Sequence, residues 1–220
     1  KLKKYKIPIP CPNNPEKSLE IQQKIVGILD RFSELTAELT AELTARKKQY
    51  EYYREQLLTF KEGKVEWKTL GEIATKISSG GTPNTSVEEY YNGKIPWLRT
   101  QEVNFVNIWD TELKITDKGL KNSSAKLIPA NCVIVAMYGA TVGKIAINKI
   151  PLCTNQACAN IQVNESIASY RYVFYYLSSR YNHIKSLGTG SQTNINARII
   201  RSYPIPIPSL EEQARIVSIL

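Results

Sequence analysis

A segment repeated near both ends of the chain limits the folds that it can adopt. Residues 5–10 (YKIPIP) and 203–208 (YPIPIP) each lead to a helix-forming segment, LEIQQKIVGIL at 19–29 and LEEQARIVSIL at 210–220. Proline in alternate positions keeps an extended segment out of the centre of a sheet, because proline has no N–H donor. We therefore predict two extended segments that each deliver the chain to a helix, with Ser18 or Ser209 as the N-cap and glutamates in the first turn.

A long amphipathic helix continues from the first copy. Its apolar residues recur at steps of three and four, with one four-residue shift before Leu43. The pattern predicts a helix of about 40 residues, on the order of 60 Å long, that ends near Gly63. No single globular domain buries so long a stripe, so we predict a coiled coil through Ile25, Ile28, Phe32, Leu35, Leu39, Leu43, Tyr50, Tyr53 and Leu57. The alternative is a surface helix folded back on its own domain.

The partner of this helix is open at the level of sequence. The second copy of the repeat stops at Leu220, where its helix begins. We expect residues 20–60 to pair with the same helix of a second copy of the chain or with a partner subunit.

A tetrapeptide, Glu-Leu-Thr-Ala, occurs three times in succession at residues 34–45. Four residues lengthen a helix by about 6 Å and rotate it by about 40° beyond a full turn. One base pair of DNA rotates the duplex by about 34–36°, although its rise of about 3.4 Å is smaller. One hypothesis is that these units set the spacing between two DNA-reading domains. The alternative is a helix of low complexity.

The middle of the sequence predicts an α+β fold, a globular mixed α/β domain attached to the long coiled-coil-forming helix. We expect a mixed or mostly antiparallel sheet. The expected segments are a strand at 65–70, a helix at 71–77, a loop at 78–83, strands at 94–99, 132–137 and 145–147, a turn at 138–144 and a helix at 169–179. The predicted boundaries give an extended proline-rich segment at 1–18, a spacer helix at 19–63, the globular domain at 64–200, and a second proline-rich segment with a helix start at 201–220.

The formal net charge of +9 resides mostly in the middle of the chain, since residues 64–200 carry +6. A basic surface attracts phosphate groups and speeds the encounter with nucleic acid. Charge alone leaves open a basic protein without a nucleic-acid partner.

The cysteines and the apolar runs argue for a cytoplasmic protein. No run of 18 apolar residues occurs, and the basic start continues into prolines, so neither a membrane span nor a signal peptide is expected. The four cysteines form no CxxC pair, and His183 is the only histidine. We predict reduced, mostly buried thiols and no zinc site.

Several short motifs together resemble the specificity (S) subunits of type I restriction–modification systems. They are GTP at 81–83 with YNGKIPW at 91–97, YGATVGKIA at 138–146, GSQTNI at 190–195, and IPIPSLEEQ at 205–213 leading into a helix. They occur in the family's order and span nearly the whole chain. The resemblance implies a DNA-binding target-recognition domain that reads one half of a split site.

The same resemblance implies partners and a departure from the family's full length. Long antiparallel helices in the family dock methyltransferase (M) subunits, and restriction/motor (R) subunits join them. A full-length member would carry another recognition domain before Lys1 and a long second helix after Leu220. The chain therefore corresponds to the central helix and the second domain, either as a fragment or as a natural half-subunit.

The candidate DNA-binding residues have side chains that hydrogen-bond to base edges and phosphates, and they cluster in predicted loops. They are Lys76, Ser78, Ser79, Thr82, Asn84, Arg99, Thr100, Gln101, Tyr138, Thr141, Lys144, Gln192, Asn194, Asn196 and Arg198. Arg99 and Lys144 also fit ordinary solvated charges, and residues 192–196 also fit local loop hydrogen bonding. We expect Trp97 in the core and Gly81, Gly139 and Gly143 in turns.

Residues for catalysis are missing from the pattern. Gly139 to Lys144 has one residue too few between its glycines for a phosphate loop, and Ile145 stands where Ser or Thr would bind magnesium. No dinucleotide-binding fingerprint or amino-methyltransferase motif occurs, and the three aspartates are scattered. We expect no enzyme and no cofactor or metal here, with S-adenosylmethionine, ATP and Mg in partner subunits. The alternative function is a coiled-coil protein-interaction adaptor without DNA specificity.

Overall fold

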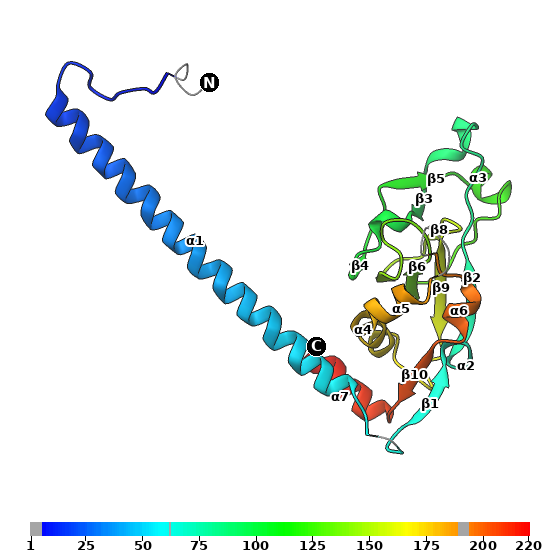
Figure 1. Ribbon diagram of the computed structural model, residues 1–220. Helices are drawn as coiled ribbons and strands as arrows, with labels where there is room; N and C mark the ends of the chain where they lie inside the picture. The colour runs from blue at the N-terminus through cyan, green and yellow to red at the C-terminus, as the bar shows by residue number, and fades with distance from the viewer. Residues whose placement is uncertain (1–5, 62, 189–193) are drawn as a thin grey trace. The chain divides into compact units, whose positions relative to one another are not determined.

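A computed structural model describes residues 6–61, 63–188 and 194–220. The chain divides into two compact units, Lys1–Tyr53 and Arg54–Leu220 (Figure 1). Within the described part of the chain, no helix is both long and apolar enough to cross a membrane.

The first unit consists largely of helix α1, which spans Pro15–Leu58 and has 44 residues. The helix confirms the predicted length but begins earlier than predicted. Asn14 Oδ1 accepts a hydrogen bond from Lys17 N at 3.1 Å, and Pro15 occupies the first helical position, where its fixed φ favours the helix. Ser18 is therefore not the N-cap. It lies inside the helix and accepts a hydrogen bond from Gln22 Nε2 at 3.0 Å.

The tetrapeptide repeat forms regular helix within α1. The hydroxyls of Thr36, Thr40 and Thr44 donate to the carbonyl oxygens four residues earlier, at 2.7, 2.7 and 2.8 Å. These bonds satisfy the hydroxyls inside the helix and leave the leucines free to form a side-chain stripe.

Most of the predicted coiled-coil side chains are exposed, with 42–66% of their surface accessible. They are Ile25, Ile28, Phe32, Leu35, Leu39, Leu43, Tyr50 and Tyr53. Leu57 differs, because it packs against the core of the second unit, to which the last turn of α1 belongs. The helix ends at Leu58 rather than near Gly63, which lies in the following turn with a φ of +74°.

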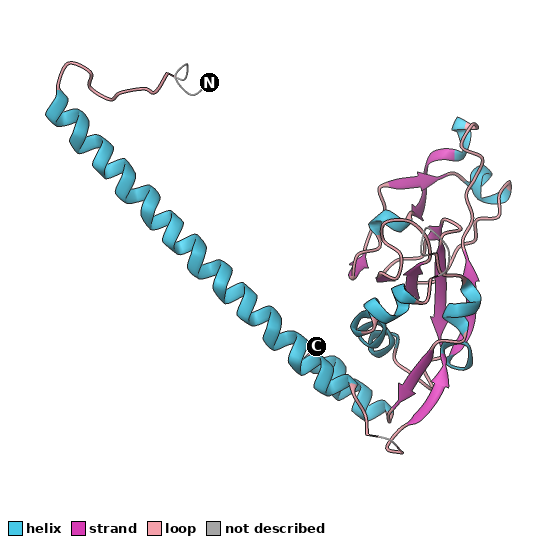
Figure 2. Ribbon diagram, in the orientation of Figure 1, coloured by secondary structure: helices cyan, strands magenta, loops and turns pink. Residues whose placement is uncertain are grey.

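The second unit is built on a five-stranded sheet with the order β2-β9-β6-β7-β4. Strands are drawn in magenta in Figure 2. The strands pair antiparallel except for β4 and β7, which are parallel, so the predicted mixed sheet is confirmed. Their bounds are Ala74–Ser79, Cys158–Val163, Val133–Ala136, Ile145–Asn148 and Val106–Ile108.

The remaining strands form two smaller sheets. One has the order β5-β3-β8, with bounds Leu113–Ile115, Tyr91–Leu98 and Cys153–Thr154. The other pairs β1 (Glu66–Thr69) with β10 (Pro204–Ile207) in antiparallel register. The second proline segment thus joins only one neighbour, as its missing N–H donors require.

Short helices surround these sheets, and two of them test predictions directly. Their bounds are α2 Leu70–Ile73, η2 Glu88–Tyr90, η3 Thr100–Glu102, α3 Asp117–Lys121, α4 Tyr170–Ser179, α5 Tyr181–Ser186, α6 Ala197–Arg201 and α7 Leu210–Ile219. The predicted helix at 71–77 is wrong beyond Ile73, because β2 begins at Ala74 and pairs with β9. Ser209 is confirmed as the N-cap of α7, since its hydroxyl accepts from Glu212 N at 3.2 Å.

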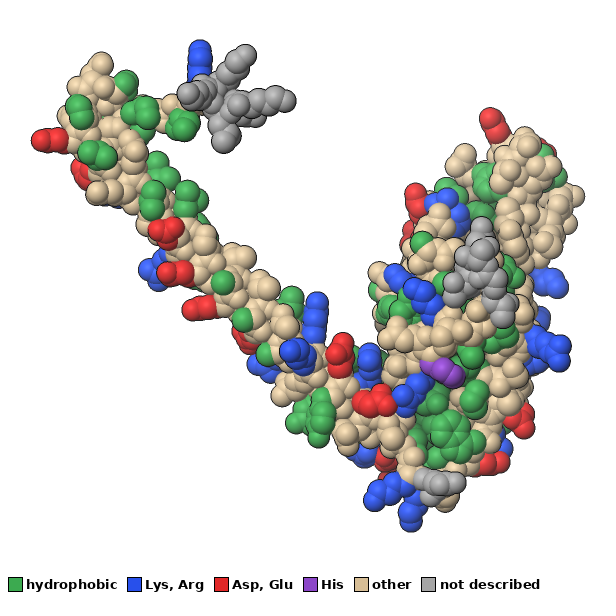
Figure 3. Space-filling model, in the orientation of Figure 1, with side chains coloured by type: hydrophobic (Ala, Val, Ile, Leu, Met, Phe, Trp, Pro, Cys, Tyr) green, Lys and Arg blue, Asp and Glu red, His purple; other side chains and the backbone are tan. Residues whose placement is uncertain are grey.

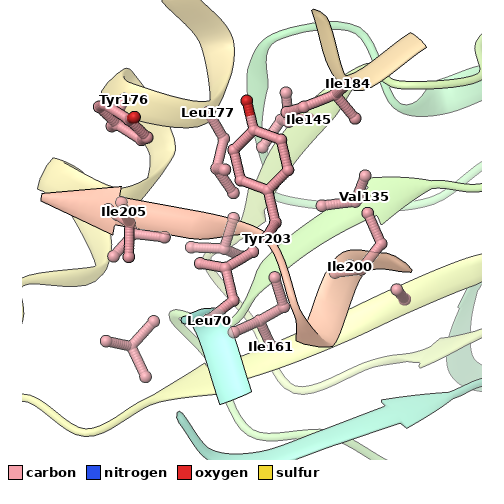
Figure 4. Packing of buried hydrophobic residues seen from close by; sticks show 14 of the residues in the cluster. Leu70, Val135, Ile145, Ile161, Tyr176, Leu177, Ile184, Ile200, Tyr203 and Ile205 are labelled. Atoms are coloured by element: carbon pink, nitrogen blue, oxygen red, sulfur yellow. The ribbon is translucent and has the colours of Figure 1, made fainter. Parts of the chain in front are cut away.

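The main core lies between the five-stranded sheet, α4 and the returning segment near β10 (Figure 4). Tyr203 and Ile205 point into it from one side and Tyr176 and Leu177 from α4 (Figure 4). The predicted boundaries at 18/19, 63/64 and 200/201 remain predictions, but this core packs residues 203–220 against the middle of the chain.

Candidate nucleic-acid interface

The topology of the five-stranded sheet brings most candidate loops to one end. Strand β2 ends at Ser79, which pairs with Ala159 near the start of β9. Strand β6 ends at Ala136, paired with Cys158, and β7 starts beside it. We call this the loop end, and define it by residues 80–90, 99–105, 137–144 and 155–157.

Hydrogen bonds between the loops hold them against one another. Thr141 Oγ1 donates to Thr100 O at 2.7 Å, which joins the loop at 137–144 to helix η3. Met137 N donates to Ala157 O at 2.8 Å, and Ile195 N donates to Met137 O at 3.0 Å. Residues 194 and 195 therefore lie at the loop end as well.

Glycines allow the close backbone approach in the loop after β2. Gly81 N donates to Thr154 O, and the buried Trp97 ring donates from Nε1 to Gly81 O, both at 2.9 Å. A Cβ at Gly80 would lie 2.0 Å from Thr154 O, and one at Gly81 would lie 2.3 Å from the backbone of Ser124. Trp97 is thus a core residue, as predicted.

The turn role predicted for the glycines holds at two of three positions. Gly139 and Gly143 both have a φ of +81°, a left-handed conformation that favours glycine. Gly81 has no positive φ, and close packing, rather than turn geometry, accounts for a glycine at this position.

The structure places eleven of the predicted DNA-binding residues at the loop end or in the last two residues of β2, which lead into it. They are Ser78, Ser79, Thr82, Asn84, Arg99, Thr100, Gln101, Tyr138, Thr141, Lys144 and Asn194. Lys76 lies earlier on β2, and Asn196 and Arg198 lie at the start of α6, which packs beside β2. Gln192 lies outside the described residues.

Some candidates already have partners within the protein. Arg99 Nη2 lies 2.6 Å from Glu112 Oε2 in an ion pair, and Lys144 Nζ donates to Asn104 Oδ1 at 2.8 Å. Asn196 Oδ1 caps α6, which leaves only its amide N–H groups for another contact. Arg99 and Asn196 therefore have structural roles that any DNA contact must accommodate.

Sequence reasoning missed two polar residues of the same end. Gln156 is exposed and hydrogen-bonds to Thr82 Oγ1, and Asn104 holds Lys144. Both lie away from the glycine-rich segments that guided the selection. The polar stretch between Cys153 and Cys158 was the available signal for Gln156.

Basic side chains gather along the edge of the second unit where β2 and α6 lie (Figure 3). Exposed Lys76, Arg198 and Arg201 belong to these two elements, and Arg201 Nη2 donates to Ile77 O at 3.3 Å. This edge adjoins the loop end through β2, so a phosphate backbone that contacts the loops would meet positive charge nearby.

Three of the four cysteines, Cys132, Cys153 and Cys158, are buried free thiols, whereas Cys11 is exposed. Burial raises the pKa of Cys132 and of Cys153 to about 11. Burial, and then the charge of Glu102, raise the pKa of Cys158 to about 12. Among residues 6–61, 63–188 and 194–220, no group of three or more His, Cys, Asp or Glu side chains is arranged to hold a metal ion.

A long helix joined to a mixed-sheet α+β unit, with its polar loops at one sheet end, is the class that the fold and site define. Residues 62–220 match the family described as the Type I restriction modification DNA specificity domain, and the chain belongs to that family. The predicted family is thereby confirmed.

Individual relatives place the chain more closely. It is 47% identical over 223 residues to the EcoR124I/EcoR124II specificity subunit of Escherichia coli, covering 98% of this chain and 54% of that protein. It is 71% identical over 77 residues to the Escherichia coli EcoprrI specificity subunit, covering 32% of this chain and 19% of that protein. The chain thus spans about half the length of the first relative.

Solved structures share the fold at lower identity. The HsdS subunit from Thermoanaerobacter tengcongensis has a TM-score of 0.59 at 19% identity, covering 93% of this chain and 49% of that one. The type I restriction–modification S subunit from M. genitalium has a TM-score of 0.60 at 17% identity, covering 90% and 52%.

Proposed function

We propose that the second unit reads one half of a bipartite DNA site as part of a type I restriction–modification complex. The observation that carries the proposal is the convergence of separate polar loops at one end of the sheet, next to the basic edge of β2 and α6. Side chains from several loops can contact base edges while Lys and Arg hold phosphates.

Helix α1 has the properties of a spacer and docking element in this proposal. Its exposed apolar stripe fits a coiled-coil partner, either the same helix of a second copy or a helix of a partner subunit. Methyltransferase subunits are the expected partners, and restriction/motor subunits would join through them. Catalysis, S-adenosylmethionine, ATP and Mg would belong to these partners, and the complex would act in the cytoplasm.

Selection from a randomised duplex library at moderate salt tests the reading function. The chain is incubated alone and with a type I methyltransferase subunit, and bound duplexes are sequenced. We expect one enriched half-site motif, whose affinity falls steeply with salt. Recovery of no motif in either condition, with binding to protein partners retained, would favour the coiled-coil adaptor instead.

A matched pair of variants controls for net charge. Arg198→Ala removes a cation from the basic edge, whereas Lys24→Ala removes one from an exposed ion pair with Glu20 on α1. Both variants lose one positive charge. Only Arg198→Ala is expected to weaken binding to all duplexes, because a phosphate contact is independent of sequence.

Sedimentation tests the pairing of α1 separately from DNA binding. Leu39→Glu places a charge in the middle of the exposed stripe, where Leu39 is 60% exposed. We expect wild-type chains to associate, alone or with the methyltransferase, and the variant to lose that association. A wild-type chain that remains monomeric and fails to bind the methyltransferase would contradict the docking role.

A further inference from the structure

A buried glutamine of α7 forms hydrogen bonds at the N-terminal end of helix α4. Gln213 is fully buried, and its Oε1 accepts from Ser169 N, the N-cap residue of α4, at 2.8 Å. Its Nε2 donates to Ile167 O at 3.2 Å and to Pro208 O at 2.9 Å. Both donors and the acceptor of the amide are therefore used, which ties the first turn of α7 to the start of α4.

At its other end, α4 forms an ion pair with the last turn of α1 within the second unit. Arg180, the C-cap residue of α4, donates from Nη1 to Glu55 Oε1 at 2.9 Å, and its guanidinium lies 5.6 Å from the Tyr176 ring. Leu58, one turn further along α1, is only 1% exposed and packs in the main core. Burial raises the pKa of Glu55, but the hydrogen bond and charge of Arg180 outweigh it and leave that pKa lowered.

Aromatic residues connect the two ends of α4 to strand β10. Tyr176 stacks on Tyr172 with ring centroids 6.5 Å apart, and the buried Tyr172 hydroxyl donates to Pro206 O at 2.8 Å. The end of α1, the start of α7 and the proline strand are therefore all held by one ten-residue helix.

We infer that α4 positions two spacer segments, the C-terminal end of α1 and helix α7, against the DNA-reading domain. Arg180 and Gln213 are the positioning residues. The inference rests on the proposed function, in which the spacer sets the separation of two half-sites. Because α4 fixes where each spacer segment meets the domain, it limits the half-site separations that the complex accepts.

Double electron–electron resonance on the full chain tests, without DNA, whether α4 positions the end of α1 and helix α7. In a Cys11→Ser background, spin labels are attached at Lys121→Cys in α3 paired with Gln56→Cys in α1, or paired with Ala214→Cys in α7. All three positions are exposed and lie in the second unit. Each pair is expected to give a single narrow distance maximum in the otherwise wild-type chain.

The two positioning residues are expected to act on different label pairs. Arg180→Gln should broaden the distance distribution of the 56–121 pair and leave that of the 214–121 pair unchanged, and Gln213→Met should do the reverse. Arg180→Lys keeps the positive charge and Gln213→Asn keeps the amide. These milder variants are measured if Arg180→Gln or Gln213→Met does not fold. The charge-reversed pair Glu55→Arg with Arg180→Glu should restore the 56–121 maximum, which a purely local packing defect would not.

The control variant is Glu20→Gln, which breaks an exposed ion pair of α1 with Lys24 and should change neither distance. Distances that stay narrow in folded Arg180 and Gln213 variants, or that broaden equally in the control, would overturn the inference. These measurements do not depend on DNA, so a failure to select any motif would refute the proposed function alone. In complexes that do select a bipartite motif, the variants should recover more than one half-site separation; a single retained separation would refute the spacing role.

Discussion

The buried amide of Gln213 offers the sharpest test of how the repeat contributes to stability. Gln213→Leu keeps the volume similar but leaves Ser169 N, Ile167 O and Pro208 O without their partner. An unpaired buried polar group costs about 1–3 kcal/mol, and the added apolar burial offsets part of that cost. We expect the free energy of unfolding to fall by roughly 2–4 kcal/mol, within the upper range for single substitutions.

Gln22→Leu is the matched control, because Gln22 holds the same position in the first copy of the repeat. Gln22 is only half-buried, and its amide donates to Ser18 Oγ within the same helix. We expect a change within about 0.5 kcal/mol.

Urea denaturation followed by tryptophan fluorescence measures both variants, since Trp97 is buried in the second unit. Thermal melts should agree, with Tm lowered by roughly 4–16 °C for Gln213→Leu, because about 2–4 °C accompanies each kcal/mol in a protein of this size. Equal losses in the two variants, or a Gln213 variant as stable as wild type, would refute the reasoning that buried amide bonds, rather than helix content, distinguish the copies.

Three further predictions concern charge and thiol chemistry. The pKa of Glu55 is lowered in the folded protein, so its pairing with Arg180 stabilises the fold above about pH 4.5. This stabilisation is lost as the pH falls through the lowered pKa. Solvent screening keeps the stabilisation below about 1 kcal/mol. Unfolding measured against pH should therefore show wild type and Arg180→Gln converging in acid, and a constant difference would contradict the pairing. At pH 8 a thiol reagent should label the exposed Cys11 but not Cys158, whose pKa is raised to about 12, until urea unfolds the chain; mass spectrometry of the labelled peptides decides. In salt titrations of duplex binding, Arg198→Ala should lower the slope of log affinity against log salt by about 1, and an unchanged slope would remove Arg198 from the interface.

Strand and helix types could be predicted where local pattern and tertiary pairing agree. The continuous apolar run that forms β6 and the apolar face of α4 are both predicted from sequence. Residues 74–77 were assigned to a helix because β2 is an edge strand whose pairing with β9 lies far along the chain. No local signal reports a partner so distant in sequence.

The candidate site could be predicted as a set of loops but not as a surface. Residue type and glycine content pointed to the segments near Gly81 and Gly139, and the sheet topology then brought them to one end. The roles of single side chains could not be predicted, because they depend on neighbours from other loops. Arg99 and Glu112 illustrate this, since no helical or strand periodicity connects the two residues that form the ion pair.

The two copies of the repeat show why similar sequences give different environments. Ser209 caps α7, whereas Ser18 lies inside α1, because Asn14 and Pro15 begin that helix earlier. Ile216 is fully buried while Ile25 in the same repeat position is 48% exposed. The shared sequence encodes a helix with one apolar face and one amide, but burial depends on the surface opposite. A surface that held Gln22 as α4 and its flanks hold Gln213 would have to present one backbone donor and two backbone acceptors within reach of a single amide.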